Sequence, residues 1–352
     1  QEPMLQNCEI SSGAHWYLSL PRVLEMSLQP HLREQHPRLP ITPVAAPASF
    51  EAVYDGVMAN LRAVLAAETA LEREQGERWP EVNPCPLISA TLADCLAQGR
   101  DLSQGGTRYH PTAICFVGLA TLADSLNAIR LAVFERRLCS YEALVRALAD
   151  DFAGAGELLA ALRRLPHFGQ DDGEADALAA RVARDVAAAC RGLTNERGGP
   201  FQPALFSYYQ FATMAKSVGA TPDGRRAGDW LSQGASPSRL ARTPSVAHYV
   251  SSVAHVDFTA YPASAVLDLQ LPLVLDPAGT SEAYLALLKT LIRRRAHTWQ
   301  CSLVSPEALR DAQAHPERHG ELVVRVVGYS AYFVTLERAV QDEIIDRTTM
   351  GI

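Results

Sequence analysis

The sequence predicts an α/β fold with a parallel or mixed sheet, and two observations predict it. Short apolar stretches rich in valine, which are typical of buried strands, alternate along the chain with longer stretches of helical spacing. Of the 352 residues, 48% are hydrophobic and 20% are charged, which is the balance of an ordinary globular protein. The length allows one large domain or two ordinary ones.

Helical patterns dominate the first half of the chain. Residues 1–16 are rich in turn-forming residues and predict a loop. Ser49 is a suitable N-cap for a long helix over residues 50–71, where apolar residues recur at helical spacing. Further helices are predicted over residues 23–28, 90–97, 122–134, 141–152, 158–165 and 176–190.

Strand patterns dominate the second half. An aromatic-rich stretch at residues 200–217 is compatible with a strand that lines a cavity. The segment 221–226, with the sequence Thr-Pro-Asp-Gly-Arg-Arg, has the composition of a turn. Strands are predicted over residues 113–118, 246–256, 265–271, 298–304 and 322–327, and helices over residues 306–313 and 340–347.

Charge and cysteine content argue against several classes of protein. The net charge is −7 and no basic stripe stands out, so we expect no nucleic-acid partner. No apolar run is long enough for a membrane helix, so no membrane partner is expected. The seven cysteines contain no Cys-x-x-Cys pair, which argues against a disulfide framework or a metal site and favours the cytoplasm. The opening residues resemble neither a signal peptide nor a natural start, which predicts a longer chain or a processed product.

Gly328 interrupts a valine-rich run where the strand pattern is strongest. One interpretation is a tight turn or bulge between two short strands. The other is a glycine whose own Cα–H takes part in chemistry. Composition and spacing leave both open.

The wording around Gly328 closely resembles the C-terminal signature of glycyl radical enzymes. The matching text is Arg-Val-x-Gly-Tyr-Ser-x-Tyr-Phe at residues 325–333, continued by Gln-Asp-Glu-Ile-Ile-x-Arg-Thr at residues 341–348. Other phrases of this family stand at residues 123–129, 168–172, 219–228 and 305–312. The resemblance therefore extends from Cys8 to Thr348.

The resemblance implies a fold and a division of the chain. Members of the family form a ten-stranded α/β barrel from two half-barrels, in which a cysteine loop meets a glycine loop. Cys8 opens this chain and Gly328 nearly closes it, which is the layout of the second half, with the first half missing. We expect residues 1–215 to form the cysteine loop and a helical half-barrel, and residues 216–352 to form the glycyl radical domain. A partner chain supplying the N-terminal half-barrel is expected, unless the sequence is a fragment.

The resemblance also implies the chemistry. A radical S-adenosylmethionine activase, an iron–sulfur protein, would install a radical on Gly328, and the resting protein would need no metal or organic cofactor. Gly328 would then take a hydrogen atom from Cys8, whose thiyl radical would attack a small-molecule substrate. The expected activity is anaerobic cleavage of a C–C or C–heteroatom bond, by a lyase or a formate acetyltransferase-like enzyme. The substrate itself is beyond the sequence.

The cysteine loop departs from the family pattern. Many members have Cys-x-Glu, whose carboxylate acts as a general acid or base, whereas here Glu9 directly follows Cys8 and Ile10 takes the expected place. The two adjacent cysteines of formate-lyase members are absent as well. Glu9 is predicted to be catalytic, the alternative being a solvated loop carboxylate, and the alternative for Cys8 is a buried structural thiol.

Two non-catalytic functions stay open at this point: a radical-bearing subunit that repairs a damaged enzyme, and an inactive relative used for assembly. Arg225 and Arg325 suit either carboxylate binding or structural ion pairs that hold loops. Aromatic residues after position 207 suit either the core or a substrate pocket. No function is assigned to the isolated histidines. The aromatic residues are Tyr208, Tyr209 and Phe211. The histidines are His15, His110 and His167.

Overall fold

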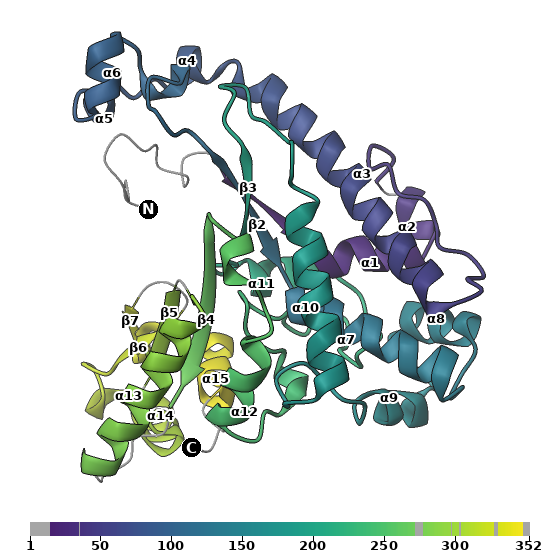
Figure 1. The fold of residues 1–352 in the computed structure, drawn as a ribbon. Coiled ribbons are helices and arrows are strands. Elements are labelled where there is room, and N and C mark those ends of the chain that lie inside the picture. Colours follow the sequence, from purple (N-terminus) through teal and green to yellow (C-terminus); the bar gives the residue numbers. More distant parts are fainter. Residues whose placement is uncertain are drawn as a thin grey trace.

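A five-stranded parallel sheet forms the centre of the molecule (Figure 1). The computed structural model describes residues 15–34, 36–271, 277–296, 298–302, 304–326 and 330–347. The strands lie in sequence order, so each pair is joined by a crossover. The predicted α/β fold with a parallel sheet is confirmed. The strands are β1 (His15–Ser19), β2 (Thr112–Val117), β3 (Phe201–Leu205), β4 (Ser264–Gln270) and β5 (Thr298–Ser302).

The sheet opens between β3 and β4, whose pairing is restricted to Ala204 with Ser264 and Leu205 with Ala265. Beyond these pairs another segment runs beside β4, where the backbone N–H of Ala235 donates to the carbonyl of Val266 at 2.9 Å. Gly234 has a φ of +54°, and a Cβ there would lie 2.3 Å from the carbonyl oxygen of Val266. Only glycine permits this close approach, so the insertion of residues 234–235 beside β4 depends on Gly234.

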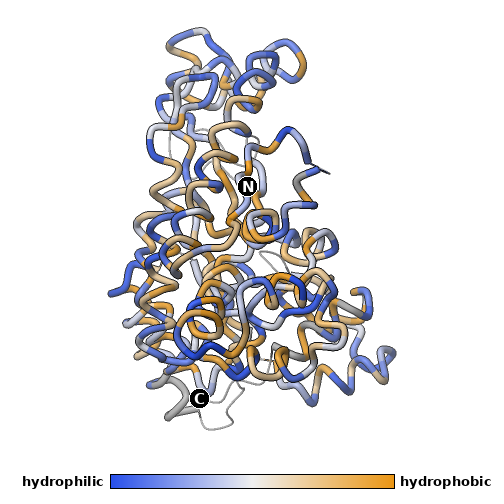
Figure 2. The backbone as a smooth tube through the Cα atoms, turned by 90° about the vertical axis from the view of Figure 1, so that its right-hand side faces the viewer, coloured by the Kyte–Doolittle hydropathy of each residue, from blue (hydrophilic) through white to orange (hydrophobic). Residues whose placement is uncertain are grey.

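Long helices cover one face of the sheet. In Figure 1 helices α3 and α10 run along its right-hand side, and Figure 2 shows hydrophilic segments at many of the outer turns. The main hydrophobic core lies between these helices and the strands. The helices are α1 (Leu20–Leu28), α2 (His31–Glu34), α3 (Phe50–Gly76), α4 (Trp79–Val82), α5 (Pro86–Ser89), α6 (Ala93–Gln98), α7 (Leu119–Ile129), α8 (Tyr141–Ala149), α9 (Gly156–Leu162), α10 (Gly173–Ala188), α11 (Gln210–Thr213), α12 (Val246–Val253), α13 (Pro277–Arg293), α14 (Pro306–Ala314) and α15 (Arg338–Arg347).

The C-terminal part of the chain adds a smaller unit. Strands β6 (Val323–Arg325) and β7 (Ser330–Tyr332) pair antiparallel, and helices α14 and α15 pack beside them. Phe333 is fully buried in a second core that also contains Val117 of β2 and Phe211. This second core therefore attaches the C-terminal unit to the sheet.

Most predicted helices are present, and the predicted cap is confirmed, because the Ser49 hydroxyl accepts from the backbone N–H of Ala52 at 3.3 Å. The strand predicted over residues 246–256 is wrong, since this segment forms helix α12. Its valines and tyrosine recur at helical spacing, and the Ser245 side chain caps the helix.

Three other expectations need correction or limitation. The loop predicted over residues 1–16 overlaps β1, which begins at His15. No helix was predicted over residues 277–293, where the structure has α13. Only the start of the aromatic-rich stretch is a strand, because β3 ends at Leu205 and α11 begins at Gln210. The division of the chain after residue 215 stays a prediction.

Candidate active site

The three residues predicted to carry the chemistry, Cys8, Glu9 and Gly328, lie outside the described residues. Their neighbours in the sequence are described. The chain enters the sheet at His15, the first residue of β1. On the two sides of residues 327–329, β6 and β7 pair with Arg325 opposite Ser330. Gly328 therefore falls in the short connection between two paired strands.

This pair of strands is fastened to the sheet by Arg325. Its Nε donates to Oε1 of Gln300 on β5 at 3.1 Å, and its Nη1 donates to Oγ of Ser330 on β7 at 3.1 Å. One guanidinium thus joins β5, β6 and β7. The predicted loop-holding function of Arg325 is supported by this geometry, although its described partners are neutral side chains.

The two faces of the sheet differ in chemistry, because side chains alternate along a strand. Ile114 and Phe116 of β2 point into the main core beneath the helices, whereas Cys115 belongs to a separate small cluster on the other side. We call that other side the inner face. The alternation assigns to it Tyr17 of β1, Ala113 and Cys115 of β2, Ala204 of β3, Asp268 of β4 and Gln300 of β5.

The thiol and the phenol on the inner face are held in their neutral forms. Burial raises the pKa of Cys115 to about 12. Burial also raises the pKa of Tyr17 to about 12, with further contributions from Cys115 and Tyr208. At neutral pH this wall therefore presents S–H and O–H groups without charge. Neither residue was singled out in the sequence, because only the strand register places them together.

Asp268 is the acidic residue of the inner face. Its Oδ2 accepts from Nε2 of Gln233 at 2.5 Å, and its backbone N–H donates to Oγ of Ser236 at 3.0 Å. Asp268 is paired in register with Gln300, the residue that holds Arg325. We call Gln233, Asp268, Gln300, Arg325 and Ser330 the inner-face row.

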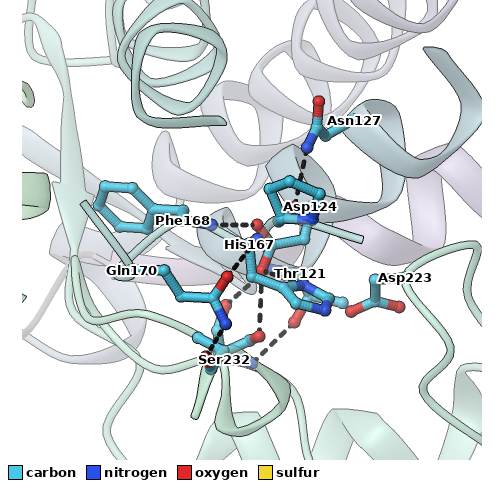
Figure 3. Close-up of polar contacts among 12 residues, drawn as sticks. Thr121, Asp124, Asn127, His167, Phe168, Gln170, Asp223 and Ser232 are labelled. Carbon is cyan, nitrogen blue, oxygen red and sulfur yellow. Dashed lines mark hydrogen bonds and ion pairs between the residues drawn. The ribbon is translucent and has the colours of Figure 1, made fainter. Parts of the chain in front are cut away.

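Three of the segments that resemble the family, residues 123–129, 168–172 and 219–228, meet at one place outside the inner face (Figure 3). Asp124 of α7 accepts from the backbone N–H of Phe168 at 2.8 Å and from the hydroxyl of Ser238 at 3.0 Å. Nδ1 of His167 lies 3.4 Å from Oδ2 of Asp124, and Figure 3 shows the imidazole pointing toward Asp223. We call Asp124, His167, Asp223, Arg225 and Ser238 the buried polar cluster.

Burial shifts the protonation of this cluster. Desolvation raises the pKa of Asp223, which is almost fully buried. Desolvation alone disfavours the charged form of His167, but its contact with Asp124, together with the attraction of both carboxylates, raises the pKa of His167 above its usual value. The cluster therefore retains protons in the folded state. His167 had been assigned no function, since its acidic neighbours are distant in sequence.

Arg225 holds its own loop. It is 3% exposed and donates to the backbone carbonyls of Val218 at 3.2 Å, Arg226 at 2.8 Å and Asp229 at 2.5 Å, and to that of Gly219. The structural interpretation of Arg225 is thus favoured. The prediction was that ion pairs would hold the loop, whereas the structure shows hydrogen bonds to backbone carbonyls.

The aromatic residues that follow β3 differ from one another. Phe211 is buried and packs edge-on against Trp230 at 5.2 Å between ring centroids. Tyr209 contacts both of these rings. Tyr208 is 43% exposed. The core interpretation therefore holds for Phe211, but Tyr208 is open to solvent in this structure.

Two family models match the chain. The model described as pyruvate formate lyase-like matches residues 1–213, and the model described as glycine radical matches residues 231–334. The chain belongs to the glycyl radical enzyme family. Among curated relatives, the (2S)-3-sulfopropanediol dehydratase of Klebsiella oxytoca is 31% identical over 77% of this chain and 34% of its own length. The probable dehydratase YbiW of Escherichia coli (strain K12) is 33% identical over 74% of this chain and 34% of its own length.

Solved structures of glycyl radical enzymes share this fold. The glycerol-bound B12-independent glycerol dehydratase of Clostridium butyricum superposes with a TM-score of 0.88 and 26% identity. The match covers 95% of this chain and 44% of that protein. The chain thus spans about a third of the length of the curated relatives that it matches and less than half of this solved one.

No group of three or more His, Cys, Asp or Glu side chains in the described part of the chain is arranged to hold a metal ion. None of the helices traced there is long and apolar enough to cross a membrane.

Proposed function

We propose that this chain is the part of a glycyl radical enzyme that contains both radical-bearing residues, Gly328 and Cys8. The observation that carries the proposal is the attachment of the strands flanking Gly328 to the inner face of the sheet. Arg325 joins these strands to Gln300 of β5, in the same sheet face that presents Tyr17 and Cys115.

The proposed chemistry follows from the bonds involved. A glycine Cα radical is stabilised by the amide nitrogen and carbonyl on its two sides, and the absent side chain lets the centre become planar. A radical S-adenosylmethionine activase removes one hydrogen atom from Gly328. Gly328 then takes a hydrogen atom from Cys8, and the thiyl radical removes one from the substrate. Cys115 and Tyr17, whose pKa values are raised by burial, present neutral groups on the inner face, and neutral groups suit a hydrogen-atom transfer because they do not compete with it by proton transfer.

The relatives favour cleavage of a C–heteroatom bond. The three proteins named above are dehydratases by name, and the isethionate sulfite-lyase of Nitratidesulfovibrio vulgaris is 30% identical over 66% of this chain. We therefore propose a lyase that eliminates water or another leaving group from a small molecule, with Glu9 as one acid–base group. The acyltransferase alternative has no support from these names. Because oxygen destroys such radicals, we place the enzyme in an anaerobic cytoplasm.

We also propose how the barrel is completed. Five parallel strands with an inner face match one half of a ten-stranded barrel, and the solved relative is more than twice as long. We propose that the missing half is supplied either by the remainder of a longer chain or by a partner chain. The mass of the native protein under denaturing conditions would distinguish these two sources, because a longer chain stays in one piece and a partner chain separates.

Electron paramagnetic resonance tests the radical. The full-length protein, activated without oxygen and frozen, is expected to show a glycine-centred doublet that is lost in Gly328→Ala. Gly320→Ala is the matched control, because no atom lies within 4 Å of a Cβ at position 320. Absence of the doublet from the activated wild-type protein would refute the proposal.

Substitution of Cys8 separates catalysis from repair. Cys8→Ala is expected to retain the glycine doublet and to lose all product formation, whereas a repair subunit would retain activity in the reconstituted complex. Cys139→Ala is the control, since this half-buried thiol lies in the outer helical layer.

Exposure of the activated protein to air separates an enzyme from an inactive relative. A radical at Gly328 reacts with oxygen and cuts the chain there, which mass spectrometry detects as a short C-terminal fragment. An uncut chain would favour the inactive relative.

A further inference from the structure

A cavity of about 400 Å³ lies beside the buried polar cluster, and we call it the Asp223 cavity. Its lining is buried at one end, where Thr121, Asp223 and Ser238 lie, and exposed at the other, where Asp229 and Asp342 lie. The two exposed residues belong to a loop of the main body and to helix α15 of the C-terminal unit. The cavity therefore opens at the seam between these two parts of the molecule.

One oxygen of Asp223 has no hydrogen-bond partner among the residues described. Oδ1 accepts from the hydroxyl of Thr221 at 2.5 Å and from the backbone N–H of Arg225 at 3.3 Å, whereas Oδ2 is left without a donor. Asp223 is 1% exposed, so bulk water does not hydrate this oxygen. Buried polar groups are nearly always hydrogen-bonded, so an orphan of this kind calls for a partner.

The neighbouring side chains do not supply the donor. Arg225 donates its five N–H groups to the hydroxyl of Thr221 and to four backbone carbonyls. The hydroxyl of Ser238 donates to Asp124. His167 points toward Asp223 in Figure 3, but neither of its ring nitrogens makes a hydrogen bond within the part of the chain that the structure describes. The donor is therefore expected from a molecule bound in the cavity.

The lining determines which molecule fits. The buried end offers an acceptor beside a guanidinium whose donors are all used, so an anion finds no donor there. Trp230 and Leu240 add apolar surface that suits a short hydrocarbon chain. At the mouth, the carboxylates of Asp229 and Asp342 outnumber the guanidinium of Arg239, which lies over the Trp230 ring at 4.5 Å. This balance favours a positive charge in the ligand.

We propose that the Asp223 cavity binds a small primary alkylamine, whose nitrogen donates to Oδ2 of Asp223 and whose hydrocarbon chain packs against Trp230 and Leu240. A metal ion fits less well, because no group of three or more acidic, histidine or cysteine side chains in the described ranges is arranged to hold one. The inference concerns the resting protein and goes beyond the proposed function, which uses neither the cavity nor an amine.

The contact leaves no proton unaccounted for. Burial raises the pKa of Asp223, so the empty cavity favours the neutral carboxyl group. An ammonium group next to Oδ2 favours the carboxylate instead, and the proton of the carboxyl group passes to the solvent. The result is a charge-assisted hydrogen bond, which is stronger than one between neutral groups.

Calorimetric titration of the resting full-length protein with n-butylamine tests the inference, and saturable binding at one site per chain is expected. Tetramethylammonium has the charge without an N–H donor, and butan-1-ol has a donor without the charge. Each is expected to bind at least about tenfold more weakly, because a hydrogen bond to a charged group contributes that factor or more. Absence of saturable butylamine binding would overturn the proposal, as would equal binding of tetramethylammonium.

Two variants locate the site. Asp223→Asn keeps the acceptor for Thr221 and Arg225 but puts an NH₂ group in place of Oδ2, so we expect butylamine binding to weaken by about 10- to 100-fold. Leu240→Trp fills the cavity from its wall, leaves the carboxyl group itself unchanged and should weaken binding by a similar factor. Asp55→Asn on the exposed side of α3 is the control and should bind like the wild type.

Hydrogen exchange separates a lost site from a lost fold. Butylamine should slow exchange at residues 221–230 of the wild type and leave α3 unchanged. If Asp223→Asn does not fold, Leu240→Trp still decides the question. Undiminished binding to a folded Leu240→Trp, or protection that excludes residues 221–230, would overturn the assignment of the site. These measurements need no radical, so their failure and the absence of the glycine doublet are distinguishable.

Discussion

The buried polar cluster and the inner-face row are built from the same kinds of side chain but differ in exposure. In the cluster, Asp124, His167 and Asp223 are at most 2% exposed. In the row, Gln300 is buried, but Asp268 is half-buried and Arg325 is exposed. The cluster joins loops that are distant in sequence, whereas the row runs across β4 to β7. The comparison teaches that polar groups hold the scaffold in both places, but those of the cluster are sealed in the interior whereas the row leaves part of its polar surface open.

The largest expected effect is on the cluster, through Arg225. Arg225→Met leaves several buried backbone carbonyls without donors, so we expect a loss of about 3–5 kcal/mol in the free energy of unfolding. Denaturant unfolding measures it. Arg226→Met, at an exposed neighbour, is the control and should cost about 1 kcal/mol or less. Equal losses in the two variants would remove the distinction between sealed and open groups.

Asp124 should follow with a smaller loss. Asp124→Ala removes the acceptor for the N–H of Phe168 and the hydroxyl of Ser238, and it leaves His167 without its closest carboxylate. We expect a loss of about 2–4 kcal/mol, measured by the same unfolding experiment. Asp55→Ala on the surface of α3 is the control, and a similar loss there would contradict the prediction.

The cluster also predicts a dependence of stability on pH. The pKa values of His167 and Asp223 are both raised in the folded state, so folding binds protons. Their contribution is complete below the ordinary values of 6.5 and 3.8 and is lost as the pH rises through the folded values. Melting temperatures between about pH 6 and 8.5 should therefore fall more steeply for the wild type than for His167→Gln. Parallel curves would show that His167 does not retain a proton.

The inner-face row should show the smallest effect on stability. Arg325→Met removes two hydrogen bonds at an exposed site, so we expect a change of less than about 1 kcal/mol. Hydrogen exchange in β6 and β7 should nevertheless become faster, because these strands lose their link to Gln300. Gln313→Met, which breaks a contact between α14 and α15, is the control. Unchanged exchange in Arg325→Met would mean that the guanidinium does not fasten the strands.

Local patterns predicted much of the fold. The cap at Ser49, the strand in β2 and the helix in α14 follow from turn chemistry and periodicity. The same rules failed for residues 246–256. Their valine content favoured a strand, but the apolar residues recur at helical spacing and the segment forms α12. Strand β1 was missed because it begins inside a stretch whose composition predicts a loop.

The site was less predictable than the fold. The sequence named Cys8, Glu9 and Gly328 through wording alone, and these residues stay predictions. The sequence did not indicate that Asp268 lies on the inner face. That position depends on strand register, and its partner Gln233 is distant in sequence. His167 likewise acquires acidic neighbours only in three dimensions.

Strand β1 has a practical consequence. It bonds to β2 along one side, and no other strand in the described part of the chain pairs with its remaining side. A free row of amides and carbonyls is a template for adding foreign strands. Recombinant production of this polypeptide by itself should therefore yield insoluble or concentration-dependent oligomers, and co-expression with the proposed second half-barrel should prevent them.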